Sequence, residues 1–381
     1  MRVAILGDYP RDPSKIGGGA EAVVTYLVQG LRQIPDLDLH VVTLCDALEQ
    51  NATVQQDGLT VHYVPAAYRL ANVTFFIRNR IRLLRALRSV EPDLIHAQVA
   101  GTYAQVAFQT KRPAVLTLHG IRYREANLRQ GFLNRVLRRH LITFDERRGI
   151  KAANNIIAIN PYILEEFAHV IRGQVYHIEN PLADAFFDVS DETEPGRVLF
   201  VGRIIPLKGI LFLMQAIESL RHQIPNVQVC LAGRPMRDHG PSYPETLRTY
   251  VRDHNLEEHV HFLGQLDETA LLQEYAHCAI LVLPSRQETA PMVIAQAMAA
   301  GKAVVATRVG GIPHLVDHGR TGMLIEFGDV NGLVEAMASL LTDDARRACM
   351  GEQGRIEANQ RFRTEIVAAK TYEVYQQILG L

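Results

Sequence analysis

Short apolar, β-branched runs alternate with stretches of helical periodicity along the first half of the chain. The runs read as buried strands at residues 3–6, 39–44, 60–64, 94–97, 114–118 and 155–159. Amphipathic stretches at 20–33 and 78–89 separate some of them and predict helices. Because alternating strands and helices need crossover connections, this half predicts a mainly parallel sheet.

A second series of the same kind follows. Its strands are expected at 198–201, 227–232, 259–263, 279–283, 303–307 and 322–325, and its helices at 210–222, 245–254, 268–277, 292–300 and 331–341. Residues 188–196 between the two series are acidic and polar and end in Pro-Gly, which is typical of a linker.

A chain of 381 residues is longer than a single hydrophobic core usually supports, so two domains are expected. We predict an N-terminal domain over 1–187, a linker over 188–196 and a second domain over 197–361. Residues 362–381 again read as a helix. The fold class is α/β, with two Rossmann-like domains whose parallel sheets face a central cleft. Ligands bind at the carboxyl edges of such sheets.

Composition places the protein among globular chains without a membrane span. Hydrophobic residues make up 48% and the formal net charge is −1, so no polyanionic partner is indicated overall. No segment approaches the roughly 20 apolar residues that a spanning helix needs. The four cysteines lie far apart, which indicates a reducing compartment, and the expected location is the cytoplasm, including the inner membrane face.

Positive charge is concentrated in one region. From Arg78 to Arg148 the chain has 15 Lys and Arg against five Asp and Glu, interleaved with apolar residues such as Phe75 and Phe132. Basic amphipathic helices suit an anionic membrane surface or a phosphorylated lipid acceptor. A solvated helical face explains the pattern equally well. No nucleic-acid partner is expected, because no recognised reading module accompanies the charge.

Two glycine-containing loops follow predicted strands. In the first, Gly17-Gly18-Gly19 precedes a helix, where backbone N–H groups can meet a phosphate, although a merely flexible loop fits as well. In the second, Gly202-Arg203 is followed by Lys208-Gly209 at the start of the next helix. An Arg fork and a Lys point charge five residues apart can converge on a pyrophosphate, which we favour over two solvated cations.

A third loop joins the strand at 279–283 to a helix. Its sequence is Pro-Ser-Arg-Gln-Glu-Thr-Ala-Pro from Pro284 to Pro291. Glu288 can accept bonds from two sugar hydroxyls, and Gln296 lies two helical turns beyond it. The backbone N–H groups of Ala290, Met292 and Val293 can meet sugar oxygens or phosphate. The alternative is a capping Glu288 and a packed, satisfied Gln296; the Met292 side chain is expected in the core.

His119-Gly120 follows the apolar strand at 114–118, where a side chain is placed for ligand contact. A lone histidine is more often structural. The other histidines show no metal-ligand spacing, so packing or surface roles are expected for them.

These motifs, in this order, resemble family 4 glycosyltransferases of the GT-B fold over nearly the whole chain. The resemblance implies a retaining, metal-independent enzyme without a cofactor, using a nucleotide-diphosphate sugar and a saccharide or lipid-linked acceptor. Such a role belongs to bacterial surface polysaccharide or glycolipid synthesis. The resemblance also implies that residues 1–187 form the acceptor-side domain, that residues 197–361 form the nucleotide-sugar-binding domain, and that the last helix, 362–381, packs back on the N-terminal domain. It further implies that Arg203 and Lys208 hold the diphosphate and stabilise the leaving group. Glu288 would bind sugar hydroxyls, His119 would lie near the sugar and the acceptor, and Gly18 and Gly19 would approach the donor.

One position departs from the family pattern. The family's Glu-x7-Glu reads Glu288-x7-Gln296 here, which replaces a paired acceptor for the ribose hydroxyls by one oxygen and an NH2 group. This keeps open a nucleotide-sugar-binding partner subunit with little or no transferase activity. A nucleotide-sugar epimerase of the same fold is a further alternative, because fold alone does not fix function. Transfer or hydrolysis of the donor would separate an enzyme from a binding subunit.

Overall fold

The computed structural model describes residues 1–12, 16–67, 76–121, 124, 132–235 and 242–381, with the backbone alone for 132–139 and 242. The chain forms two compact units. Unit 1 contains Met1–Asn127, Gly131–Pro181 and Thr364–Leu381, and unit 2 contains Leu182–Arg363. Each unit is an α/β fold around its own mostly parallel sheet, which confirms the predicted class.

Unit 1 is built on a sheet of strand order β3-β4-β2-β1-β5-β6-β7-β8 in its described part. All neighbouring strands pair in parallel except β3, which runs antiparallel to β4 at the edge. The strands are β1 Arg2–Leu6, β2 Asp38–Cys45, β3 Ala52–Gln56, β4 Leu59–Pro65, β5 Leu94–Ala97, β6 Ala114–Leu118, β7 Asn155–Ala158 and β8 Gln174–His177. The sequence pattern predicted six of these strands. It missed β3 and β8, whose residues are mostly exposed or half-buried and therefore carry no apolar run.

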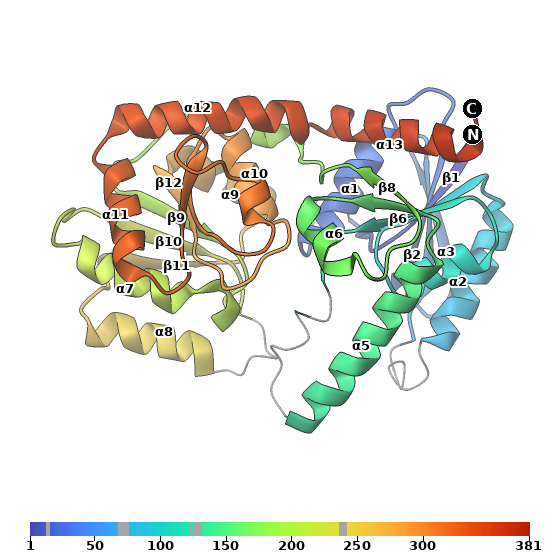
Figure 1. Cartoon of the computed structure of the whole chain (residues 1–381), viewed down its shortest axis with the longest axis horizontal. Helices are drawn as coiled ribbons and strands as arrows, with labels where there is room; N and C mark the ends of the chain where they lie inside the picture. Colours follow the sequence, from blue (N-terminus) through green and yellow to red (C-terminus); the bar gives the residue numbers. More distant parts are fainter. Residues whose placement is uncertain (13–15, 68–75, 122–123, 125–131, 236–241) are drawn as a thin grey trace. The chain divides into compact units, whose positions relative to one another are not determined.

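Helices cover this sheet (Figure 1). They are α1 Gly19–Leu31, α2 Ile77–Val90, α3 Thr102–Gln109, α5 Phe132–Ala152, α6 Pro161–Phe167 and α13 Thr364–Leu379. Although α13 is the last helix of the chain, it belongs to unit 1 and packs on α1. The two backbones approach closely at Gly30, where an added Cβ would lie 2.7 Å from Thr364 and 2.8 Å from Ala368. Val374 and Tyr375 complete the same apolar core as Val28 and Leu31.

Unit 2 has the strand order β11-β10-β9-β12-β13-β14, all parallel, as the sequence predicted. The strands are β9 Arg197–Val201, β10 Gln228–Ala232, β11 Val260–Gly264, β12 Ile280–Leu283, β13 Ala303–Thr307 and β14 Gly322–Ile325. The helices are α7 Ile210–Leu220, α8 Ser242–Asp253, α9 Glu268–His277, α10 Met292–Ala299, α11 Val330–Leu341 and α12 Asp344–Arg361. Among the described residues of both units, no helix combines the length and apolar character needed to cross a membrane.

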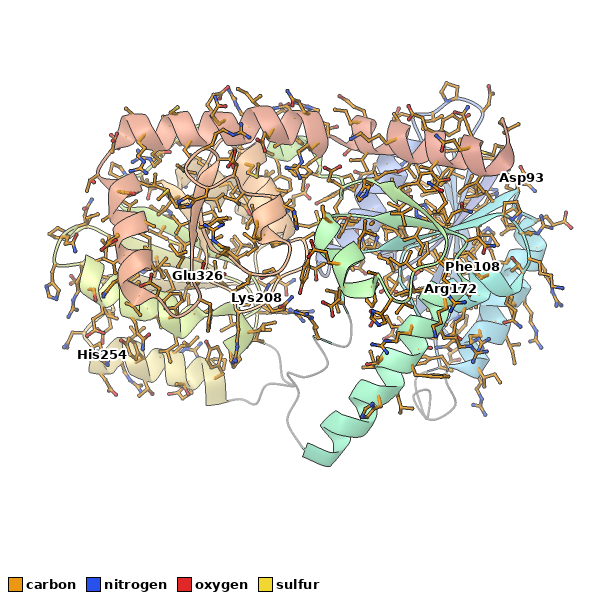
Figure 2. All side chains as sticks on the ribbon, in the orientation of Figure 1. Asp93, Phe108, Arg172, Lys208, His254 and Glu326 are labelled. Carbon is orange, nitrogen blue, oxygen red and sulfur yellow. The ribbon has the colours of Figure 1, made fainter. Side chains whose placement is uncertain are left out.

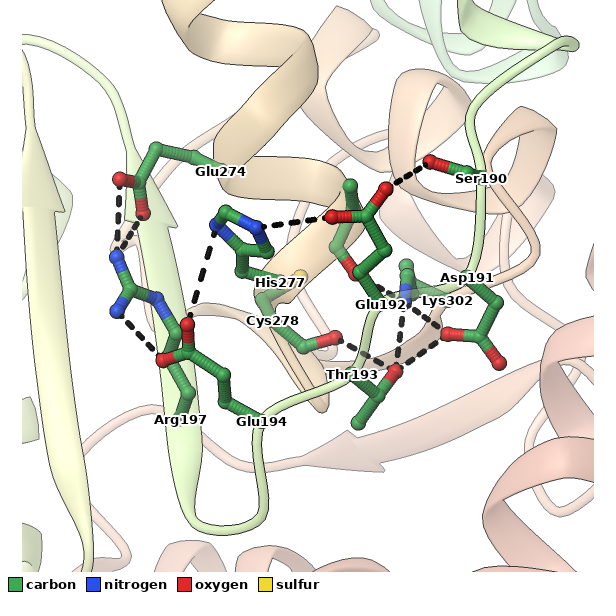
Figure 3. Close-up of polar contacts among 11 residues, drawn as sticks. Ser190, Asp191, Glu192, Thr193, Glu194, Arg197, Glu274, His277, Cys278 and Lys302 are labelled. Carbon is green, nitrogen blue, oxygen red and sulfur yellow. Dashed lines mark hydrogen bonds and ion pairs between the residues drawn. The ribbon is translucent and has the colours of Figure 1, made fainter.

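The expected linker at 188–196 is part of unit 2. The chain enters this unit between Pro181 and Leu182, and Leu182, Phe186 and Phe187 are buried in its core. Residues 191–194 then bind the region around the end of α9 (Figure 3). The ammonium of Lys302, only 4% exposed, donates to Asp191 Oδ1 at 2.7 Å, Thr193 Oγ1 at 2.8 Å and the Ala276 carbonyl at 2.9 Å.

The linker prediction therefore placed the boundary too late. Polar composition identified a segment with exposed side chains, such as Asp191 at 80%, but could not reveal that a buried lysine holds it. The chain returns to unit 1 between Arg363 and Thr364, since Phe362 is still buried in the core of unit 2.

Candidate functional site

Two neighbouring strands bring the predicted motifs of unit 2 together. β9 and β12 pair in parallel, so the loops that follow them lie side by side at the carboxyl edge of the sheet. The β9 loop carries Arg203 and ends in the short 3-10 turn η2 Pro206–Lys208, and the β12 loop carries Glu288. The Arg286 N–H donates to the Leu207 carbonyl at 2.8 Å and joins the two loops directly.

Lys208 and Glu288 form an ion pair at this edge (Figure 2 labels Lys208). Lys208 Nζ lies 2.5 Å from Glu288 Oε1, and the two side chains are 13% and 10% exposed. The Ser285 hydroxyl donates to the same oxygen at 2.6 Å, and the Thr307 hydroxyl donates to the Ser285 carbonyl at 2.5 Å. The carboxylate is therefore held in one orientation by two donors. The loop that carries it is anchored to β13 through Thr307.

Glycines make this packing possible. Gly209 has φ +68°, and a Cβ there would lie 2.0 Å from the Pro284 carbonyl oxygen. Gly310 has φ +54°, and its Cβ would lie 1.9 Å from the carbonyl oxygen of Glu288. Both positions combine a left-handed backbone with a close approach to another main chain, so no other residue fits without moving the Glu288 loop.

The remaining predicted residues of unit 2 lie on the same two loops and on α10. Arg203 is exposed on the β9 loop, and Lys208 extends past the preceding Gly202, whose added Cβ would lie 3.7 Å from Lys208 Cε. Within the described chain no acceptor meets the backbone N–H groups of Met292 and Val293, which begin α10, or that of Ala290. These three N–H groups can donate hydrogen bonds to an anionic or hydroxylated ligand.

Gln296 is turned toward the protein interior. Its side chain is buried, and its Oε1 accepts a hydrogen bond from the Tyr275 hydroxyl at 3.1 Å. The same hydroxyl lies 3.1 Å from the Val293 carbonyl. The oxygen of Gln296 thus has a partner in the core of unit 2.

His119 lies just beyond β6 in unit 1 and is partly exposed. Its Nδ1 is 2.9 Å from Asn180 Oδ1 and its Nε2 is 2.7 Å from Gln98 Oε1. Desolvation lowers the pKa of His119 to about 4, so the ring is neutral at pH 7. With both nitrogens hydrogen-bonded to the protein, the ring cannot take a proton from a ligand without first losing one of these bonds.

Gly18 and Gly19 begin α1, and a Cβ on either would meet nothing within 4 Å. The preceding Gly17 N–H already donates to the Glu21 carboxylate at 2.5 Å. The loop is therefore open on the side of Gly18 and Gly19, while Glu21 contributes a negative charge beside it.

The basic region is only partly available for binding. On α2, Arg80 donates to Gln109 and Arg82 donates to the Pro65 carbonyl, whereas Arg78, Arg85 and Arg88 are exposed. The same helix exposes Ile77 by 52% and Ile81 by 44%. Arg122, Arg129 and the predicted Phe75 lie outside the described residues, as do the side chains of Phe132 and its neighbours up to 139.

Several residues of the site were not predicted from sequence. Ser285 was not singled out within its loop, although a hydroxyl three residues before Glu288 can donate a hydrogen bond to that carboxylate. Gln98 and Asn180 belong to no recognisable sequence motif. Their proximity to His119 follows only from the fold, in which β5, β6 and β8 end at the same edge of the sheet. His96 was expected, like the other histidines, in a packing or surface role, and the structure adds Tyr375 as its hydrogen-bonding partner.

Family models match both halves of the chain. "Glycosyltransferase Family 4" matches residues 17–184, and "Glycosyl transferases group 1" matches residues 183–357. Among curated proteins, the chain is 28% identical to alpha-maltose-1-phosphate synthase of Mycolicibacterium smegmatis over 410 residues, covering 99% of this chain and 100% of the relative. It is 26% identical to an uncharacterised glycosyltransferase of Methanocaldococcus jannaschii, covering 95% of each chain.

Solved structures share the fold. Sucrose-phosphate synthase from Thermosynechococcus elongatus superposes with a TM-score of 0.79 at 22% identity, covering 100% of this chain and 99% of that one. The Anabaena protein HepE, solved in complex with UDP and glucose, superposes with a TM-score of 0.75 at 21% identity, covering 98% and 99%.

Proposed function

This chain belongs to glycosyltransferase family 4, and we propose that it moves a sugar from a nucleoside-diphosphate sugar to an acceptor with retention of anomeric configuration. The observation that carries the proposal is the Lys208–Glu288 pair at the carboxyl edge of unit 2, with Arg203 on the adjoining loop. Two cations suit a diphosphate, and a carboxylate fixed by Ser285 suits sugar hydroxyls.

The proposed chemistry stabilises the departing diphosphate. The acceptor hydroxyl attacks the anomeric carbon while the bond from that carbon to the β-phosphate oxygen breaks on the same face. The acceptor's proton passes to the leaving phosphate, and a nucleoside diphosphate departs. Lys208 and Arg203 offset the charge that develops on it, so we propose that no metal or other cofactor is required.

His119 supports this route for the proton. Its two ring nitrogens are occupied by Asn180 and Gln98, and its lowered pKa, about 4, makes the neutral ring a weak base. We therefore place His119 beside the sugar as a fixed contact rather than as the proton acceptor.

A thermal-shift screen with uridine, guanosine and adenosine diphosphate sugars tests donor binding. We expect one nucleotide to raise the melting temperature, and the rise to disappear in Arg203→Ala and Lys208→Ala. Arg355→Ala, which removes an exposed cation of α12 paired with Glu352, is the matched control and should keep the full shift. If no nucleotide sugar shifts the transition, the proposal is wrong.

Incubation with the identified donor then distinguishes the alternatives. Transfer or slow hydrolysis that releases nucleoside diphosphate, with an α-configured product from an α-configured donor by NMR, supports a retaining transferase. Binding without turnover supports a partner subunit. Conversion of the donor to an epimer with no acceptor present supports an epimerase.

We propose further that the acceptor is a saccharide or a lipid-linked molecule in surface polysaccharide or glycolipid synthesis, met in the cytoplasm at an anionic membrane face. The support is the α2 surface, where Arg78, Arg85 and Arg88 are exposed together with Ile77 and Ile81. Co-sedimentation with vesicles tests it. Binding should require phosphatidylglycerol beside phosphatidylcholine and should weaken in Ile81→Ser and in Arg85→Gln. Equal recovery with both vesicle types would remove the membrane from the proposal.

A further inference from the structure

A chain of polar side chains crosses the interior of unit 1 from α13 to His119. Tyr375 Oη lies 2.6 Å from His96 Nδ1, and Gln98 Nε2 lies 3.1 Å from His96 Nε2. Gln98 Oε1 lies 2.7 Å from His119 Nε2, and His119 Nδ1 lies 2.9 Å from Asn180 Oδ1. This series of hydrogen bonds therefore connects α13 to His119 of the candidate site.

The backbone fixes the middle of this chain. His96 is in β5 and Gln98 follows it, two residues apart and hence on one face of the strand. Both are fully buried. Gly7 leaves the space for Gln98, since a Cβ on Gly7 would lie 3.0 Å from Gln98 Cβ. Polar groups buried this completely are kept only when their hydrogen bonds are made.

Both histidine rings are neutral in this environment. Desolvation lowers the pKa of His96 to about 3 and that of His119 to about 4. A neutral imidazole has one donor nitrogen and one acceptor nitrogen. His119 contacts two amide oxygens as the side chains are oriented, and a neutral ring cannot donate to both. One amide, of Gln98 or of Asn180, must therefore be reversed, because amide oxygen and nitrogen are assigned from their partners.

Reversing Asn180 keeps Gln98 as a donor to His96 Nε2. His96 Nδ1–H then donates to the phenol oxygen of Tyr375, and the phenol proton has no acceptor among the described residues. Reversing Gln98 instead lets the Tyr375 O–H donate to His96 Nδ1. The His96 Nε2–H then meets Gln98 Oε1 and also the Thr117 hydroxyl oxygen, 2.6 Å away.

The second arrangement matches donors to acceptors better. A phenol is a stronger hydrogen-bond acid than the alcohol of threonine, and an alcohol oxygen is the better acceptor. It leaves only the Thr117 proton without an acceptor among these residues, whereas the first leaves the phenol proton. Burial also raises the pKa of Tyr375, so the phenol keeps the proton that it donates.

We propose that Tyr375, His96 and Gln98 are positioning residues that hold the His119 ring in its Nδ1–H form through this hydrogen-bonded chain. In that form His119 donates to Asn180 and accepts from Gln98, with its orientation fixed from both sides. The role in transfer rests on the proposed function, because it assumes that His119 contacts the sugar. The proton arrangement itself does not depend on any substrate.

Nitrogen NMR of protein labelled with 15N-histidine tests the arrangement without substrate. The 15 histidines can be assigned by removing single rings, as in His119→Asn. In the wild type we expect the proton of His96 on Nε2 and that of His119 on Nδ1. The opposite assignment for either ring would overturn the proposal.

Gln98→Glu separates the two arrangements directly, because a carboxylate can accept from both rings but cannot donate. We expect His119 to change, to the Nε2–H form or to a charged ring, while His96 keeps its tautomer. A change at His96 with an unchanged His119 would show that the amide of Gln98 points the other way and would refute the proposal. Should this variant not fold, the wild-type assignment and Tyr375→Phe still decide.

Tyr375→Phe removes only the phenolic hydroxyl with which the series of hydrogen bonds begins. We expect the His96 Nδ1 resonance to shift and the His119 resonances to move or broaden. Tyr372→Phe, half-buried on the same helix, is the matched control and should leave both rings unchanged. Unmoved His96 and His119 resonances in Tyr375→Phe would contradict the linkage.

Once a donor is known, Tyr375→Phe should lower kcat about fivefold with little change in KM for the donor, since the contact is misplaced rather than lost. Tyr372→Phe should behave like the wild type. An unchanged kcat beside a shifted NMR spectrum would refute the role in transfer while leaving the proton arrangement standing. No turnover in any variant, the wild type included, would instead count against the proposed function.

Discussion

Lys208 Nζ and Glu288 Oε1, 80 residues apart in sequence, lie 2.5 Å apart at the carboxyl edge of the second sheet. The two groups that we assign to opposite ends of a donor thus neutralise each other in the free protein. A nucleotide sugar would replace this bond, giving the ammonium a phosphate and the carboxylate a set of hydroxyls. Binding therefore requires the Lys208–Glu288 ion pair to break, and two new charge-assisted contacts with the donor offset the lost interaction.

Glu288→Gln should separate phosphate binding from sugar transfer. The amide keeps the shape and can still accept from Ser285, but it no longer neutralises Lys208. We expect a free nucleoside diphosphate to bind about threefold to tenfold more tightly by calorimetry, since about 1 kcal/mol of competing ion pairing is removed. Transfer should fall about 100-fold, because the sugar loses a charged acceptor.

Glu326→Gln is the control for that experiment. Glu326 is 71% exposed and pairs with Arg308 at 3.3 Å in the same unit, so its neutralisation should change neither quantity. Weaker binding of the nucleoside diphosphate to Glu288→Gln would mean that the carboxylate does not restrain Lys208.

Gly310→Ala should displace the loop that carries Glu288. Its Cβ would lie 1.9 Å from the Glu288 carbonyl, whereas Gly319, at φ +82°, has nothing within 4 Å of its Cβ position. Both substitutions carry the left-handed backbone cost, about 1–2 kcal/mol. Only Gly310→Ala should cost more than that in urea unfolding and also weaken donor binding; equal losses in the two variants would refute the close-approach argument.

Lys302→Met should destabilise the protein more than removal of its ion-pair partner. The methionine removes the ammonium's bonds to Thr193 and to the Ala276 carbonyl, which keeps only the Glu192 N–H as a donor at 3.2 Å, and these losses should together cost about 2 kcal/mol. Asp191 is 80% exposed, so Asp191→Asn should cost less than about 1 kcal/mol. Differential scanning calorimetry measures both, and a larger loss in Asp191→Asn would show that the ion pair, rather than the lysine's bonds to Thr193 and Ala276, dominates.

Acid should destabilise the protein through His96 and His119. Burial holds the pKa of His96 at about 3 and of His119 at about 4, below the ordinary value of 6.5. Below pH 6.5 the unfolded chain therefore binds protons that the folded chain does not. The free energy of unfolding should fall as pH drops from 6.5 to 5, by up to about 1.4 kcal/mol per pH unit for each ring.

His96→Gln checks this assignment, because it removes one of the two rings and should reduce the pH slope of urea stability. His177→Gln, which changes an exposed ring, should keep the wild-type slope. A slope unchanged in His96→Gln would show that other groups cause the acid sensitivity.

The sequence predicted what depends on apolar periodicity and local motifs. All six strands of unit 2 follow from their apolar runs, and the motifs at Lys208 and Glu288 fall at the ends of two of them. It could not show that these side chains contact each other, because that follows from β9 lying beside β12, a neighbourhood set by the strand order.

Other features left no periodic signal. α12 was missed because residues 344–361 are largely polar and include Gly351 and Gly354, although Gly351 is needed where an added Cβ would lie 2.1 Å from the Gly301 carbonyl. His96 was read as packing because nothing in the sequence joins it to Tyr375, 279 residues later. Long-range contacts of this kind follow only from the tertiary fold.

The place of α13 in unit 1 has a consequence for biosynthesis. A ribosome makes the strands of this unit first and the helix that supplies Val374 and Tyr375 only after all of unit 2. Nascent domains usually fold in the order in which they emerge. Here unit 1 lacks the core residues of α13 until translation has passed residue 375. Unit 2 can therefore fold first, and the surface of α1 that packs on α13 stays uncovered until that helix has been made.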